Sequence, residues 1–160
     1  MIVNPEVESY LNDLGRPTDP VIVEMERLGR ERGFPIIGPQ VGRICELLAR
    51  SIGARAVFEM GSGFGYSTWW FARAVGEGGR VIHTDGSADL SAEARGHLGR
   101  AGLDGRVDFR VGDARDLLAD VGGHEGLVRV DLLAVPVRAV HDELGAHAAL
   151  GRDLGRGRDP

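Results

Sequence analysis

A short apolar run that meets an acid and then three glycines constrains this chain more than any other stretch. The segment reads Val57-Phe58-Glu59-Met60-Gly61-Ser62-Gly63-Phe64-Gly65-Tyr66-Ser67. Residues 56–60 are β-prone and bounded by glycine, which predicts a strand buried on both faces of a parallel sheet. The glycines let the backbone turn sharply, and we expect a helix to begin near Tyr66 with Ser67 and Thr68 as caps. A helix N-terminus that points at a glycine-lined crevice favours an anion.

The spacing of the glycines argues against a dinucleotide site. Such a site has the pattern G-x-G-x-x-G, but here Gly65 comes one residue early and Tyr66 stands in the place of the third glycine. Glu59 would also meet a pyrophosphate with the wrong charge, whereas it suits a cation. S-adenosylmethionine fits better, because it carries a sulfonium, an ammonium and one carboxylate and has no phosphate. An NAD-dependent oxidoreductase fragment is therefore the weaker alternative.

The same stretch resembles motif I of the class I S-adenosylmethionine-dependent methyltransferases. In the form Glu-x-Gly-x-x-x-Gly-Tyr-Ser it is similar to the O-methyltransferases of the catechol and caffeoyl-CoA type, and the resemblance covers residues 8–120. It implies an α/β fold with a Rossmann-like doubly wound sheet, S-adenosyl-L-methionine as cofactor, and a small-molecule acceptor with a hydroxyl. The residues that it implies for the cofactor around the turn are Glu59, Gly61, Ser62, Gly63, Gly65, Tyr66 and Ser67, with Ile37 and Gly38 over its methionine end.

A second acid is expected in the same crevice. Residues 80–84 read as a strand, and Asp85-Gly86-Ser87 ends it. Ligands of open α/β sheets bind beyond the carboxyl ends of the strands, and Asp85 follows Gly65 by 20 residues, close to the ~20 expected for a ribose-binding acid. We therefore expect Asp85 and Gly86 to bind the ribose. The alternative is a helix cap or a turn, because Asp-Gly is itself a turn signal.

A third strand, over residues 107–111, ends in Gly112-Asp113-Ala114. In methyltransferases that resemble this chain, such a segment lies against the adenine. Asp113 could then accept from the exocyclic amine while Ala114 offers its backbone N–H. Asp113 could equally cap a helix over residues 115–119, and both roles can hold together.

The chain divides into three predicted parts. Residues 1–54 form N-terminal helices and a cap, and a helix over residues 41–51 is expected to turn its apolar stripe inward. That stripe consists of Val41, Ile44, Cys45, Leu47 and Leu48. Residues 55–120 form the cofactor-binding half of the sheet. Residues 121–160 diverge, so we expect the sheet to be incomplete on the C-terminal side.

The divergent segment lacks the motifs that the resemblance implies for catalysis. In the metal-dependent branch, an Asp-x-Asp-Lys motif and a later Asp-Asn supply magnesium ligands and a lysine base, and neither is present. Residues 127–135 alternate like a strand but run into Pro136 without an acidic end. We therefore name no metal ligand and no catalytic residue. A frame change near residues 121–126, or disorder, would make the chain a non-catalytic remnant that only binds the cofactor.

Composition limits the partners. The chain has 160 residues, a formal charge of -5 and 27% charged residues, which argues against nucleic acid or an acidic membrane as the main partner. Because no apolar run approaches the ~20 residues of a membrane span and the N-terminus lacks a signal pattern, we expect a cytoplasmic protein. A homodimer is a further expectation. Cys45 is expected to serve packing only.

Overall fold

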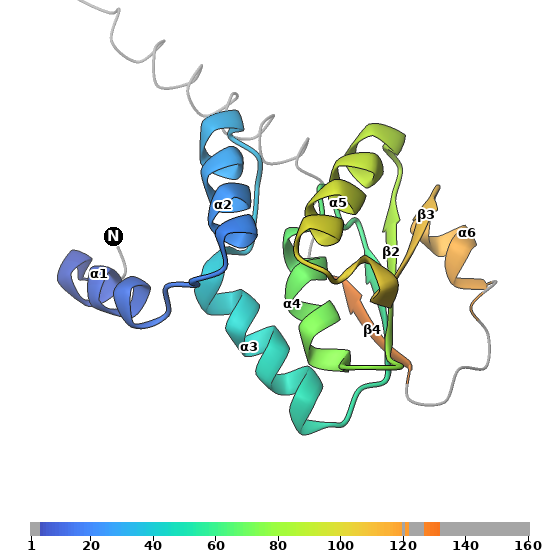
Figure 1. Cartoon of the computed structure of the whole chain (residues 1–160), viewed down its shortest axis with the longest axis horizontal. Helices are drawn as coiled ribbons and strands as arrows, with labels where there is room; N and C mark the ends of the chain where they lie inside the picture. Colours follow the sequence, from blue (N-terminus) through green and yellow to red (C-terminus); the bar gives the residue numbers. More distant parts are fainter. Residues whose placement is uncertain (1–3, 120, 122–126, 132–160) are drawn as a thin grey trace, which may run out of the picture.

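The computed structural model describes residues 4–119, 121 and 127–131, and within them the chain is an α/β protein with one parallel sheet (Figure 1). In chain order the elements are α1 Pro5–Leu14, α2 Pro20–Arg32, α3 Gly38–Ser51, β1 Ala56–Met60, α4 Tyr66–Val75, β2 Arg80–Asp85, α5 Ala88–Arg100, the 3-10 turn η1 Asp104–Arg106, β3 Val107–Val111, α6 Ala114–Ala119 and β4 Leu127–Asp131. No described helix is long and apolar enough to cross a membrane.

The sheet has the order β3-β2-β1-β4, and all of its strand pairs are parallel. Met60 at the end of β1 pairs with Thr84 on one side and with Asp131 on the other. Asp85 at the end of β2 pairs with Val111 of β3. The carboxyl ends of the strands therefore lie along one edge, where parallel sheets bind their ligands. The predicted Rossmann-like arrangement is confirmed.

The alternation of side chains along the central strands builds a core on each face of the sheet. Val57 and Val81 belong to the larger core, which includes the aromatic residues of α4. Phe58 and Ile82 point the other way, into a smaller core with Val121 and α6. Figure 1 accordingly shows α4 and α5 on one side of the sheet and α6 on the other.

Helix α3 packs on α4 through small residues, which corrects the expectation about its apolar stripe. Gly42 and Ala49 are its buried residues, and a Cβ added at Gly42 would lie 2.2 Å from Nε1 of Trp70. The large indole thus requires the small side of α3 to face inward. The apolar side chains Val41, Ile44, Leu47 and Leu48 face outward instead and are between 43% and 66% exposed.

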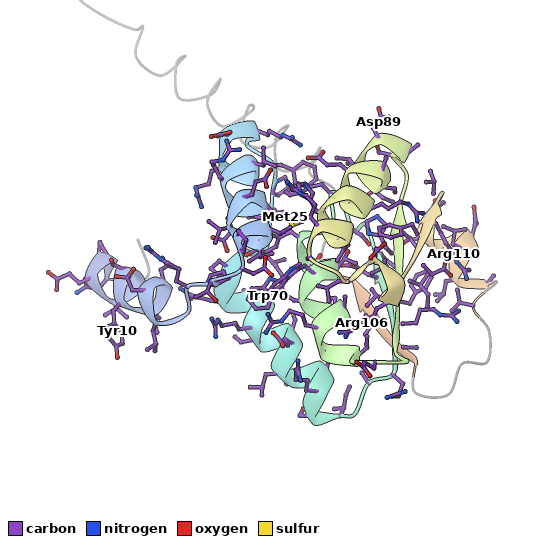
Figure 2. The ribbon with its side chains drawn as sticks, in the orientation of Figure 1. Tyr10, Met25, Trp70, Asp89, Arg106 and Arg110 are labelled. Carbon is purple, nitrogen blue, oxygen red and sulfur yellow. The ribbon has the colours of Figure 1, made fainter. Side chains whose placement is uncertain are left out.

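Helix α1 also keeps its apolar stripe exposed. Its residues Val7, Tyr10, Leu11 and Leu14 are all solvent-accessible, and Tyr10 points away from the rest of the described chain (Figure 2). The end of α1 contacts α3, where Nε of Arg43 donates 2.8 Å to the carbonyl of Gly15. The first helix is therefore attached mainly at its C-terminal end.

The fourth strand is described over Leu127–Asp131, which lies within its predicted range. Asp131, its last described residue, pairs with Met60 at the carboxyl edge of the sheet. The expectations about residues 132–160 fall outside the described residues.

Candidate functional site

The glycine-rich turn after β1 adopts a backbone that only glycine accommodates easily. Gly63 and Gly65 have φ values of 55° and 90°, in the left-handed region. A Cβ on Gly63 would lie 2.9 Å from the ring of Phe34, and one on Gly65 would lie 2.9 Å from Cβ of Ala94 on α5. The turn therefore needs glycine at both positions, for its conformation and for the close approach of its neighbours.

Side chains of β1 and β2 fix this turn to the sheet. The backbone N–H of Ser62 donates 2.9 Å to the carbonyl of Thr84, and the N–H of Thr84 donates 3.1 Å to Oγ of Ser62. The hydroxyl of Thr84 also donates 2.6 Å to the carbonyl of Glu59. All three residues are buried, so these hydrogen bonds form away from competing water.

Asp85 joins the turn from the end of the neighbouring strand. Its Oδ2 accepts 2.8 Å from the backbone N–H of Gly63, and its Oδ1 accepts 2.8 Å from that of Ser87. The acid that the sequence placed in the crevice thus reaches the glycine turn. It also stabilises the local turn into α5, as the alternative interpretation expected.

The first turn of α4 has no side-chain cap. Gly65 is the N-cap residue and has no side chain to accept a hydrogen bond. The expectation that Ser67 and Thr68 act as caps was wrong, because both already lie inside the helix that begins at Tyr66. The N–H groups of this turn can therefore bind an anion, and the helix dipole favours one there.

Glu59 lies beneath the turn and does not line its surface. The side chain is 1% exposed, and Oε2 accepts 2.5 Å from the hydroxyl of Thr68. The same hydroxyl lies 3.1 Å from Nδ1 of His83, which is fully buried on β2. Burial raises the pKa of Glu59 more than hydrogen bonds from neighbouring hydroxyls lower it, and burial lowers the pKa of His83 to about 4.

Tyr66 connects the glycine turn to α2. The ring is buried, and its hydroxyl donates 2.9 Å to Oε1 of Glu26. Burial and this carboxylate both raise the pKa of Tyr66, so the phenol stays protonated. The hydroxyl therefore points to the N-terminal part of the chain, while the ring lines a small pocket beside the turn.

That pocket lies between the turn and the loop that precedes α3. Its walls are Phe34, Pro35, Ile36 and Ile37 on one side and Ser62, Phe64, Tyr66 and Ser67 on the other. Phe34 meets Phe64 edge to face, with ring centroids 5.0 Å apart. The cavity measures about 20 Å³, which is room for about one water molecule. Ile37 thus lines the pocket, and Gly38 begins α3.

The turn after β3 lies at the same edge of the sheet. The backbone N–H of Gly112 donates 2.9 Å to the carbonyl of Asp85, which ties this turn to β2. Asp113 is exposed and accepts from the backbone N–H of Arg115 at 2.9 Å and from its guanidinium at 2.7 Å. These contacts lower the pKa of Asp113 to about 2. Asp113 therefore caps α6, which begins at Ala114. Gly86, which directly follows β2, is exposed.

Within the described ranges, no three His, Cys, Asp or Glu side chains come together as metal ligands. Asp131 pairs with Met60 at this edge of the sheet. The donor set at this edge consists of backbone N–H groups, hydroxyls and single carboxylates. Such donors suit an organic ligand with both charges, and the residues described give no metal a complete site.

A family comparison agrees with this geometry. The model of the O-methyltransferase family matches residues 22–137. The chain belongs to the O-methyltransferase family. A catechol O-methyltransferase of Niastella koreensis is 35% identical over 114 residues, which are 70% of this chain and 52% of that protein. This member of the O-methyltransferase family therefore spans about half the length of the curated relatives it matches.

Solved structures have the same fold as this O-methyltransferase family member. A methyltransferase from Geobacter sulfurreducens is 39% identical and has a TM-score of 0.69, over 74% of this chain and 61% of that one. An O-methyltransferase from Bacillus cereus, solved in complex with SAH, is 30% identical and has a TM-score of 0.67, over 79% of this chain and 60% of that one. The resemblance stated from the glycine turn is confirmed.

Three residues of this candidate site were missed from the sequence. The ring of Phe34 packs against Gly63, and the carboxylate of Glu26 accepts a hydrogen bond from the hydroxyl of Tyr66. The hydroxyl of Thr68 lies between Glu59 and His83. Each belongs to a segment whose local pattern has another plain explanation: a loop, a charged helix face and a helix start. No signal in the sequence distinguishes their long-range contacts from those roles.

Proposed function

We propose that this chain binds S-adenosyl-L-methionine at the carboxyl edge of its sheet and serves transfer of the methyl group to a small-molecule hydroxyl. The hydrogen bond between Gly63 and Asp85 carries the proposal, because it brings the glycine turn and the acid of the next strand into one crevice. The relative from Bacillus cereus, solved in complex with SAH, supports this choice of cofactor.

The residues of the crevice divide by the part of the cofactor that they suit. The uncapped start of α4, with Tyr66 and Ser67, suits the carboxylate, and Asp85 suits the ribose hydroxyls. Asp113 suits the adenine at the edge of β3. The full proposed set is Glu59, Gly61, Ser62, Gly63, Gly65, Tyr66, Ser67, Asp85, Gly86, Asp113 and Ala114.

The chemistry that these residues serve is a displacement at carbon. Bound S-adenosylmethionine supplies a methyl group on a positively charged sulfur. The protein must hold that methyl in line with the acceptor oxygen and have the hydroxyl proton removed. The described residues account for holding the cofactor. None of the described residues is placed to act as the base.

The acceptor side of the crevice lies beside the loop before α3. Phe34 and Ile36 leave room for about one water molecule there, so the loop must move outward before a second molecule can enter. The walls of the pocket beside this loop are mainly apolar and aromatic, which suits a flat organic acceptor. The substrate class is therefore proposed to be a small hydroxyl compound, as the name of the catechol O-methyltransferase relative also suggests.

One observation favours a second candidate, in which the chain binds the cofactor without catalysing transfer. The sequence contains neither Asp-x-Asp-Lys nor a later Asp-Asn, which the metal-dependent branch uses for its ion and its base. Turnover separates the two candidates. Methylation of a catechol by the purified chain supports the enzyme, whereas cofactor binding without any product supports the remnant.

Calorimetry tests the cofactor itself. S-adenosylhomocysteine should bind the purified chain, and NAD should not, because Tyr66 occupies the position of the third glycine and is fixed to Glu26. Equal or tighter binding of NAD would overturn the assignment. Asp89→Ala, at an exposed position on α5, is a matched control for Asp85→Ala in the same measurement.

A homodimer is proposed from the exposed apolar residues of α1 and α3. A second copy could cover Leu14 and Leu47, which are 70% and 66% exposed. Sedimentation should then show a dimer that Leu47→Glu dissociates, while a monomer at every concentration would exclude it. A cytoplasmic location, with neither nucleic acid nor membrane as partner, completes the proposal.

A further inference from the structure

Glu59 has unusual surroundings for an acid beside a cofactor turn. It lies on β1, two residues before Gly61, and it is 1% exposed. Its carboxyl group accepts a hydrogen bond from Thr68 at Oε2, and the hydroxyls of Ser62 and Ser67 also act to lower its pKa, whereas Oε1 has no hydrogen-bond partner among the described residues. Thr68 is in turn the neighbour of Ser67 at the start of α4. The carboxyl group is therefore buried directly under the proposed binding site.

No positive charge compensates this carboxyl group in the described part of the chain, where Glu59 makes no ion pair. His83 lies on the other side of the Thr68 hydroxyl, but burial keeps its ring neutral at ordinary pH. An ionised carboxylate is costly to bury here, because it loses its hydration and gains only hydroxyl partners and no positive charge. The protonated form avoids this cost.

The other titratable groups around Glu59 do not reverse this preference. Asp85 on β2 is a further negative charge and favours the protonated acid. Cys45 on α3 is a neutral thiol whose pKa is raised, first by burial and then by Glu59. Arg95 on α5 faces His83 and helps keep that ring neutral. Among the described side chains packed around β1, no cation therefore holds Glu59 ionised.

We propose that Glu59 holds a proton in the ligand-free protein and releases it when the cationic cofactor enters the crevice above it. The inference rests on the proposed function, since the sulfonium and ammonium of S-adenosylmethionine supply the missing positive charge. The O–H bond of Glu59 breaks, the proton passes to the buffer, and the Thr68 hydroxyl donates to the carboxylate that remains. Glu59 then contributes attraction to the cation through a medium of low dielectric constant.

Calorimetry in two buffers of different ionisation enthalpy measures the released proton. S-adenosylmethionine should bind with a heat that depends on the buffer, at some point across roughly pH 5 to 8. S-adenosylhomocysteine, which lacks the sulfonium, should release a smaller fraction of a proton. Glu59→Gln keeps a neutral side chain of the same shape and should bind without release. Glu77→Gln, at an exposed position after α4, is the matched control and should behave as the wild type.

The outcomes separate this inference from the proposed function. Binding with a buffer-independent heat across the whole range would overturn the proton release and leave the cofactor site intact. Release that persists in Glu59→Gln would assign the proton to another group. No binding of either ligand would overturn both. Because Glu59→Gln can fail to fold, carbon-13 NMR of the glutamate carboxyls in the ligand-free wild type gives a second test: one glutamate should titrate above 4.5, the ordinary value.

Discussion

The backbone N–H of Gly63 and the carboxylate of Asp85 are 2.8 Å apart, although the two residues are 22 positions apart in the sequence. This hydrogen bond joins the ends of β1 and β2 at the edge where parallel sheets bind ligands. Asp85 uses its second oxygen to hold the N–H of Ser87. One side chain thus fixes both turns that border the crevice.

Asp85→Ala should weaken binding of S-adenosylhomocysteine at least tenfold. Hydrogen bonds to a charged group are worth about 1.5–3 kcal/mol each, and about 1.4 kcal/mol corresponds to a tenfold change in affinity. Calorimetry on the variant and on the control Asp89→Ala measures the effect. An affinity that Asp85→Ala leaves unchanged would remove Asp85 from the site.

Gly63→Val should abolish cofactor binding and leave the helix content intact. The new side chain meets the ring of Phe34 and must adopt a φ of 55°, which costs about 1–3 kcal/mol in the turn and leaves the core untouched. Circular dichroism and calorimetry separate the two effects. Gly96→Ala is the control, because open space surrounds Gly96 within α5, and it should stabilise the protein by about 0.5–1 kcal/mol. If Gly63→Val binds the cofactor as the wild type does, the glycine turn only connects β1 to α4 and is not part of the binding site.

Tyr66→Phe should lower the free energy of unfolding by about 1 kcal/mol, since it removes a partly buried hydrogen bond to Glu26. Urea unfolding, followed by circular dichroism, measures this change. Tyr10→Phe on the exposed side of α1 should have no effect in the same assay. Equal stabilities of Tyr66→Phe and the wild type would show that the contact between α2 and α4 does not depend on the hydroxyl.

His83 should make the protein more stable as the pH rises from about 4 to about 6.5. Burial lowers the pKa of His83 from 6.5 to about 4, so in this range the unfolded chain binds a proton that the folded chain does not. The full effect is about 3 kcal/mol at most. Urea unfolding at several pH values should show that His83→Gln loses this part of the slope. Glu59 acts in the opposite sense, because its pKa is raised in the folded protein. The folded protein therefore loses stability as the pH rises through the pKa that Glu59 has in the folded state.

The coding DNA of the last forty residues provides a separate test. These residues lack aromatic side chains and lysine, which is what a GC-rich gene tends to encode out of frame. An alternative frame after Asp120 should then encode a strand ending in Asp-x-Asp-Lys. If neither alternative frame does so, the proposed frame change near residues 121–126 is wrong.

The sequence was sufficient for the parts of the fold whose signals are local. The glycines after Met60 and the acid after Thr84 mark strand ends directly, so β1 and β2 were predicted correctly. The stripe of α3 was not, because a hydrophobic pattern shows that one face is apolar without showing which neighbour covers the helix. Here the small residues Gly42 and Ala49 face α4, since Trp70 needs the space.

Side chains that act across long distances were also beyond the sequence. Glu26 belongs to a helix face rich in charges, and most such residues are solvated, so its bond to Tyr66 could not be distinguished from the others.

The two sides of the pocket beside the glycine turn differ in how firmly they are held. The turn is fixed to the sheet by hydrogen bonds with Asp85 and Thr84, so its shape does not depend on a ligand. The opposite wall is the short loop of Phe34 to Ile37, which contacts the turn through aromatic and aliphatic packing. Preorganisation on one side and yielding packing on the other should make ligand entry a gated event, in which the association rate follows the opening of that loop and not the docking of the nucleoside.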